Sequence, residues 1–271
     1  MKTGRNENRQ ELNPVLIITG VDTSNTDSAF LTPEHIGFKA YNLARMAALN
    51  LPVPPAFVLP TAWTTHQGKL GSEVWQEALK HLENASGARF ADPRRPLLLS
   101  VRSGAPVSMP GMMETLLNIG LCNESLPGLL RLTGNPRLVW DAYRRLVASF
   151  GEVVLGMDSQ VFEADLSQIA SGRDERELDF TELRALTQAH LASVQRMTGR
   201  AFPQDPYDQL EQAISAVFSS WGAPKALDYR RLNNLSDSMG TAVTVQQMVF
   251  GNAGGTSGAG VGFTRHPSTG E

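Results

Sequence analysis

The chain has 271 residues, a formal net charge of −3, 41% hydrophobic residues and 19% charged residues. A chain of this length and composition can bury a core as one large domain or two ordinary ones, which excludes wholesale disorder. The slight acidic excess argues against a nucleic-acid binder, because such proteins carry a strongly basic surface. The single cysteine, Cys122, excludes an intramolecular disulfide and a zinc site built from cysteines alone.

Membrane and export signals are missing from the sequence. It contains no apolar run of about 18 residues, the length that a transmembrane helix needs. Residues 1–13 are polar and lack the apolar middle of a signal peptide. Together with the single cysteine, these features predict a cytoplasmic protein that does not bind membranes.

The first third of the sequence predicts alternating strands and helices. Apolar runs predict strands over residues 15–18, 57–59 and 97–101. A helix is expected over 39–49, ended by the proline-rich segment 51–55, and another begins near Ser72. Residues 19–35 and 84–96 are expected to form loops.

The middle of the sequence is predicted to be helical. Asn135 is a cap before a first-turn proline, and apolar residues at helical spacing follow it. A second helix ends at Gly199. A third begins at Asp205, where Asp205 and Asp208 are better explained by capping than as a catalytic pair. The polar and acidic segment 158–178 is expected to be a surface excursion.

The end of the sequence is rich in glycine. Strands are predicted over 241–250 and 261–265, and five of the ten residues 251–260 between them are glycine. A segment that joins two strands and lacks a Lys-Ser/Thr ending is neither a dinucleotide-binding turn nor a P-loop. It predicts either a hairpin lid, whose backbone N–H groups approach an anion closely, or an ordinary mobile hairpin.

Two basic side chains are candidates for binding phosphate. Arg102 follows a buried strand, where its guanidinium either holds an anion with two donors or forms a structural salt bridge. Lys39 follows Gly37 at an expected helix start, where it either adds charge to an anion site or is an ordinary surface lysine. The Met-rich segment 108–113 either lines an apolar wall or fills core. The five histidines show no metal-ligand spacing, so no metal site is predicted in the chain.

Several longer strings carry more specific information than any single residue. They are Gly-Phe-Lys-Ala at 37–40 followed by Leu-Pro-Val-Pro-Pro at 51–55, Ser-Val-Arg-Ser-Gly at 100–104 continued by Met-Pro-Gly-Met-Met at 109–113, Asn-Pro-Arg at 135–137, Phe-Pro-Gln-Asp-Pro at 202–206 and Gln-Gln-Met-Val-Phe-Gly-Asn at 246–252. Together they resemble the nucleotide-binding domain of the pyruvate phosphate dikinase family and, more loosely, of phosphoenolpyruvate synthases. The resemblance covers roughly residues 35–271.

The resemblance implies an α/β (α+β) fold, an ATP-grasp-like nucleotide-binding domain with a helical insertion that is truncated at its C-terminal end. The implied divisions are an N-terminal strand and polar segment over 1–34, a first ATP-grasp-like subdomain over 35–134, a helical region over 135–239, and a Gly-rich hairpin over 240–271 that begins the second subdomain.

The resemblance also implies how ATP would be bound between the two subdomains. Phosphate oxygens would be held by Lys39 and Arg102. The adenine would be bordered by Gln246, Met248 and Val249. The lid over the phosphates would be formed by Gly254, Thr256, Ser257 and Gly258.

The implied activity is phosphoryl transfer. The family moves a pyrophosphoryl group from ATP to a histidine on a separate swivelling domain, and phosphate then passes to pyruvate to give phosphoenolpyruvate, with Mg²⁺ neutralising charge. No catalytic residue is expected within this chain. The acidic Mg²⁺ ligands, the carrier histidine and the pyruvate-binding barrel are expected beyond Glu271. The expected partners are ATP and those further domains, without nucleic acid or membrane, and a homodimer is compatible with the family.

The sequence departs from the family pattern at four positions. Phe38, Ala40 and Ala56 stand where glycine is usual, and His266 stands where Asn or Asp is common. Because phosphate loops need close backbone approach, Phe38 and Ala40 favour an alternative, a non-catalytic nucleotide-binding or regulatory paralogue. A third hypothesis is a structural fragment without a ligand.

Overall fold

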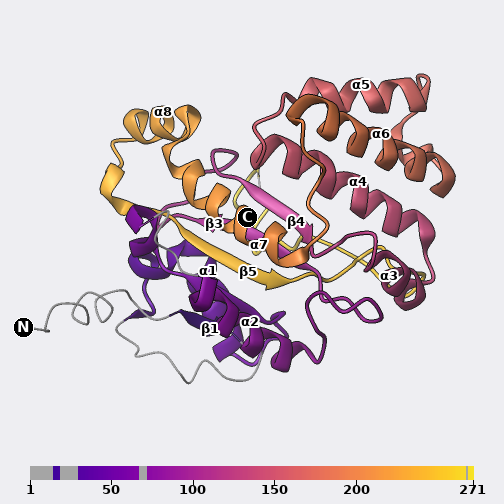
Figure 1. Cartoon of the computed structure of the whole chain (residues 1–271). Helices are drawn as coiled ribbons and strands as arrows, with labels where there is room; N and C mark the ends of the chain where they lie inside the picture. The colour runs from indigo at the N-terminus through magenta and orange to yellow at the C-terminus, as the bar shows by residue number, and fades with distance from the viewer. Residues whose placement is uncertain (1–14, 19–29, 67–71, 267) are drawn as a thin grey trace, which may run out of the picture.

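The computed structural model describes residues 15–18, 30–66, 72–266 and 268–271. Its described strands form one antiparallel sheet in the order β1-β2-β5-β3-β4 (Figure 1). The strands are β1 (Leu16–Ile18), β2 (Ala56–Leu59), β3 (Leu99–Gly104), β4 (Thr115–Ile119) and β5 (Ala242–Gln247). The last of them along the chain, β5, lies in the middle of the sheet, so the chain end and the N-terminal half share one core.

The helices of the described residues are α1 (Pro33–Ala48), α2 (Ser72–Ser86), α3 (Leu126–Thr133), α4 (Pro136–Val153), α5 (Ser159–Ala170), α6 (Phe180–Thr198), α7 (Pro206–Ser219) and α8 (Pro224–Leu232). Short 3₁₀ helices lie between them: η3 (Thr61–His66), η4 (Glu175–Glu177), η5 (Ser220–Gly222) and η6 (Asp237–Met239). Among these helices, none combines the length and apolar character that crossing a bilayer requires.

The two faces of the sheet are covered differently. Alternate strand residues such as Val101 and Val245 face the main core, which also contains apolar side chains of α2, α4 and α7. The opposite face packs against α1 in a second core, where Ala40 and Ala44 contact Val58. This second core includes no residue of β4, and Leu117 of β4 is exposed. On the α1 side of the sheet, the second core therefore covers β1 and β2 and does not extend over β4.

The helical region between β4 and β5 confirms the predicted caps. The Asn135 side chain accepts a hydrogen bond from Leu138 N (3.1 Å) at the start of α4, and Asp205 accepts one from Tyr207 N (2.9 Å) at the start of α7. Gly199 ends α6 in the left-handed conformation. In Figure 1, α4, α5 and α6 stack together beyond β4, outside the layer formed by the sheet and α1.

The structure adds to two expectations from the sequence and contradicts a third. The largely exposed segment 158–178 contains a helix, α5, because its acidic residues cap helices: Asp158 accepts a hydrogen bond from Gln160 N (2.9 Å). The helix expected from residue 39 is present, and a turn that begins at Pro33 precedes it across the interruption at Gly37. Residues 261–265 are exposed and form no strand. Since β2 and β3 already pair with both edges of β5, a second strand has no edge of β5 to join.

The main core gives a prediction about stability. Leu146 in α4 has no exposed surface, so Leu146→Ala removes buried methyl groups and leaves a cavity. We expect the free energy of unfolding to fall by about 2–5 kcal/mol, measured by urea denaturation. Leu132→Ala is the matched control, because 51% of Leu132 is exposed and the loss should be about 0.5 kcal/mol or less. Equal losses for the two variants would contradict this assignment of the core.

Candidate functional site

The structure brings Lys39 and Arg102 together. Arg102 lies on β3 opposite Thr244 of β5 and Thr115 of β4, at the border of the region that α1 covers. The pKa of Lys39 is lowered, first by burial of its ammonium and then by the positive charge of Arg102. Burial likewise lowers the pKa of the Arg102 guanidinium. Within the described residues, neither side chain forms a hydrogen bond or an ion pair with a carboxylate. Two adjacent cations without a counter-ion make a site for an anion.

A glycine contact fixes the position of Lys39. Gly37 interrupts α1 with φ 75° and ψ 153°, and the N–H of Phe38 donates to the Ala105 carbonyl (2.9 Å). A Cβ atom built on Gly37 would lie 2.0 Å from the Gly104 carbonyl oxygen. The backbones of α1 and of the end of β3 therefore touch here, and Lys39 begins the helical segment directly after this contact.

The two departures near Lys39 have different structural consequences. Ala40 is fully buried in the second core, where its methyl group packs in a regular helix and does not reduce backbone approach at the contact. Phe38 is 47% exposed and lines the cavity beside Lys39. Only Phe38 therefore changes the surface that a ligand would meet.

A cavity of about 300 Å³ lies beside Lys39. Its walls come from Phe38, Lys39 and the segment 103–115, which includes the Met-Pro-Gly-Met-Met string. Met109 is buried in a small cluster with Trp221 and Ala226, and Met113 packs against that cluster. Met109 and Met113 thus pack in this cluster and also line the cavity. The Met-rich segment therefore both fills core and forms an apolar wall, the two roles that the sequence left open.

The residues expected to border an adenine lie further along β5. Gln246 is two positions from Thr244, on the same face as Arg102, and its side-chain amide donates to the Pro54 carbonyl (3.0 Å). The Thr244 hydroxyl between them is buried without a hydrogen-bond partner among the described residues. Met248 N donates to Leu98 O (2.9 Å), while 73% of Val249 is exposed.

The Gly-rich residues lie at the other end of β5 from Lys39. Ser257 N donates to Gly254 O (2.9 Å) in a turn, and Thr256 and Gly258 are exposed. Asn135 at the start of α4 donates to the carbonyl of Asn252 (3.3 Å), which ties this segment to the α3–α4 corner. Among the described residues, Lys39 thus lies beside Arg102. The four residues expected to form the lid lie elsewhere: Gly254, Thr256, Ser257 and Gly258.

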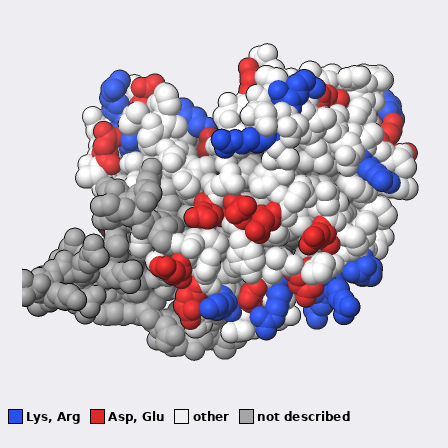
Figure 2. Space-filling model, viewed as in Figure 1, with Lys and Arg blue, Asp and Glu red and all other residues white. Residues whose placement is uncertain are grey.

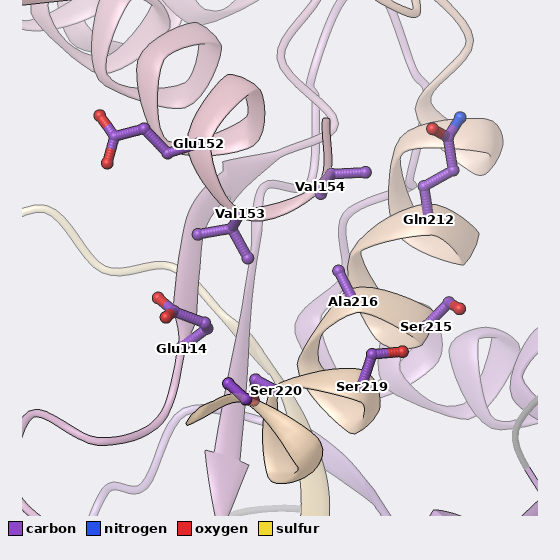
Figure 3. A pocket seen from close by; sticks show the side chains of 10 residues that line it. Glu114, Glu152, Val153, Val154, Gln212, Ser215, Ala216, Ser219 and Ser220 are labelled. Carbon is purple, nitrogen blue, oxygen red and sulfur yellow. The ribbon is translucent and has the colours of Figure 1, made fainter. Parts of the chain in front are cut away.

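A further cavity, which the sequence did not predict, has a volume of about 540 Å³. Figure 3 shows Glu152 near the end of α4 and Glu114 before β4 on one side, and Gln212 and Ser215 of α7 on the other. Lys225 pairs with Glu114 (2.5 Å). Burial and the charges of Glu114 and Glu163 raise the pKa of Glu152. The sequence could not predict this cavity, because its walls come from segments about a hundred residues apart in the chain.

The charges on one face of the described structure are mixed in sign. On the face drawn in Figure 2, the described Lys and Arg side chains stand in separate groups with acidic side chains between them. The described residues contain no group of three or more His, Cys, Asp or Glu side chains that could hold a metal ion.

The described residues form a domain of mixed helices and antiparallel sheet in which two cations, Lys39 and Arg102, lie side by side. The sequence model of the family described as "Pyruvate phosphate dikinase, AMP/ATP-binding domain" matches residues 65–271. The chain belongs to the pyruvate phosphate dikinase family and corresponds to its N-terminal nucleotide-binding domain.

Curated relatives agree with this membership. Proteins named "Pyruvate, phosphate dikinase" are 47% identical in Giardia intestinalis, 46% in Rhizobium meliloti (strain 1021) and 42% in Clostridium symbiosum. These alignments cover 87–88% of this chain but 28% of each relative. The chain thus spans little more than a quarter of the length of these relatives.

The contact at Gly37 gives a prediction about the site. In Gly37→Ala, the added methyl group would collide with the Gly104 carbonyl, and a backbone at φ 75° and ψ 153°, which essentially only glycine adopts, would itself strain an alanine by about 1–3 kcal/mol. We expect a lower midpoint of thermal unfolding. Gly255→Ala is the control, because a Cβ atom there meets nothing within 4 Å. Unchanged unfolding of Gly37→Ala would show that the two backbones are not in contact.

Proposed function

We propose that the chain is the ATP-binding portion of a pyruvate phosphate dikinase-like phosphotransferase, with an ATP-grasp-like arrangement completed by residues beyond Glu271. The observation that carries this proposal is the pair Lys39 and Arg102, which have no counter-ion among the described residues, in a family described as AMP/ATP-binding; Lys39 also lines a cavity. Phosphate oxygens are the natural anion for such a pair, since a guanidinium offers two parallel donors and an ammonium adds a point charge.

The strand β5 supports an orientation for the nucleotide. Thr244 opposes Arg102, and Met248 lies four residues further on, about 14 Å away at ~3.4 Å per residue. This span suits an extended ATP, with its phosphates at Lys39 and Arg102 and its adenine at Gln246, Met248 and Val249. The exposed side chain of Val249 and the backbone beyond β5 would then face the base.

The Gly-rich residues Gly254, Thr256, Ser257 and Gly258 act in this proposal as a lid that moves toward the phosphates. The surroundings leave room for this movement, because a Cβ atom at Gly254 or Gly258 would meet nothing within 4 Å. Mg²⁺ would neutralise the remaining phosphate charge, held by acidic ligands outside this chain. The helical insertion over 135–239 separates β4 from β5 and leaves both in the same sheet.

The full reaction in this proposal needs partners that this chain does not supply. A carrier histidine would accept the pyrophosphoryl group, and a pyruvate-binding barrel would receive phosphate from it, as the family resemblance implies. One observation favours the alternative of a regulatory paralogue: Phe38, where glycine is usual, extends into the surface of the cavity. Both hypotheses require nucleotide binding, so nucleotide binding is the first test.

We expect isothermal titration calorimetry to detect weak Mg-ATP binding to the wild-type chain. Arg102→Ala should weaken it about 10–100-fold, because a charge-assisted hydrogen bond to phosphate contributes ~1.5–3 kcal/mol. Arg200→Ala is the control, since Arg200 is exposed just after the end of α6 in the helical region. Equal heats for wild type and Arg102→Ala would remove Arg102 from the site, and no heat from wild type would refute ATP binding by this chain.

A further inference from the structure

Thr241 stands at the centre of the contacts that bring Lys39 to Arg102, although it touches neither side chain. It is fully buried, directly before β5. Its hydroxyl accepts a hydrogen bond from the N–H of Gly104 (3.2 Å) and donates one to the carbonyl of Ala242 (3.1 Å). Gly104 is the residue whose carbonyl touches Gly37. The hydroxyl therefore holds the strand end on which α1 rests.

A second threonine fixes Thr241 itself. The hydroxyl of Thr64 in η3 accepts from the N–H of Thr241 (2.9 Å) and donates to its carbonyl (2.8 Å), so one side chain satisfies both peptide groups. Thr61, also in η3, donates to the carbonyl of Glu34 in the first turn of α1 (2.7 Å). Gly240 has no room for a side chain, because a Cβ atom would lie 2.9 Å from the Thr61 carbonyl oxygen and from the Thr64 hydroxyl. These contacts join η3, α1, β3 and β5 at one point.

We propose that Thr241 is a positioning residue for the phosphate site: its hydroxyl holds Gly104, and Gly104 through Gly37 holds Lys39 beside Arg102. This inference rests on the proposed function for its meaning, but its geometry can be tested without nucleotide. Removing the hydroxyl takes away the hydrogen bond from the N–H of Gly104, so that pairing with Ala242 alone holds this strand end to β5 and Gly104 is held less firmly against Gly37. Lys39 would move outward into water, away from Arg102.

The first experiment measures the pKa of Lys39 without any ligand, by ¹³C NMR of the dimethylated lysines. Burial and Arg102 lower the pKa of Lys39, so its release should raise the pKa toward the usual lysine range. We expect this upward shift in Thr241→Val, which keeps the shape of the side chain but lacks the hydroxyl. Thr241→Ser, which keeps the hydroxyl, should titrate like wild type. Signal assignment uses Lys39→Arg, whose spectrum lacks the Lys39 resonance.

The matched control is Thr187→Val in α6. Thr187 is also fully buried and donates a hydrogen bond, to the Leu183 carbonyl (2.8 Å), but it lies in the helical region. It should lower stability without moving the Lys39 pKa. If Thr241→Val does not fold, Thr64→Val removes the neighbouring hydroxyl and should raise the Lys39 pKa in the same direction. An unchanged Lys39 pKa in the folded variant would overturn the positioning role.

The second experiment compares affinities for Mg-ATP and adenosine. Thr241→Val should weaken Mg-ATP binding about tenfold and leave adenosine binding unchanged, with Thr241→Ser restoring the wild-type ratio. A parallel loss for both ligands would indicate general destabilisation and would overturn the inference. If the wild type binds no ATP, the proposed function fails, while the Lys39 titration still decides whether Thr241 holds the two cations together.

Discussion

The contact between the backbones of Gly37 and Gly104 is the constraint on which the rest of the site depends. With a carbonyl oxygen where a Cβ atom would otherwise stand, only glycine lets α1 approach the end of β3 this closely. The approach places an ammonium beside a guanidinium at the border of a hydrophobic core. Like charges at such a place destabilise the folded protein, and an anion would relieve that repulsion. The fold thus holds two cations in a position that favours a polyanionic ligand.

The sheet explains how this contact is kept in place. Because β5 pairs with β2 on one side and β3 on the other, the segment around Thr241 joins elements that are almost two hundred residues apart in the chain. Of the helices between β4 and β5, α4, α5 and α6 stack together beyond β4, whereas α7 packs across β3, β4 and β5. After this helical stretch the chain returns to place β5 between β2 and β3.

The family membership gives this geometry its chemical context. The relatives that match are about three to four times longer than this chain, which corresponds to the N-terminal nucleotide-binding domain of the family. Phosphoryl transfer depends mainly on positioning and charge neutralisation, and in the proposed function Lys39 and Arg102 would supply part of both. Phe38 changes the surface of the cavity beside Lys39, whereas Ala40 packs in the second core. Of the two residues, only Phe38 therefore bears on ligand binding.

The sequence by itself determined the local features whose causes lie within a few residues. The caps at Asn135 and Asp205, the helix end at Gly199 and the buried strands were predictable, because capping and periodicity are local. The family strings also identified Lys39 and Arg102 as candidates. Only the tertiary structure decided that Lys39 and Arg102 lie side by side and that Ala40 belongs to the second core. It also decided that the Thr241 hydroxyl binds Gly104, the residue that contacts Gly37. It also decided that residues 261–265 do not pair with β5, since strand pairing and backbone contact depend on residues distant in sequence, which periodicity does not record.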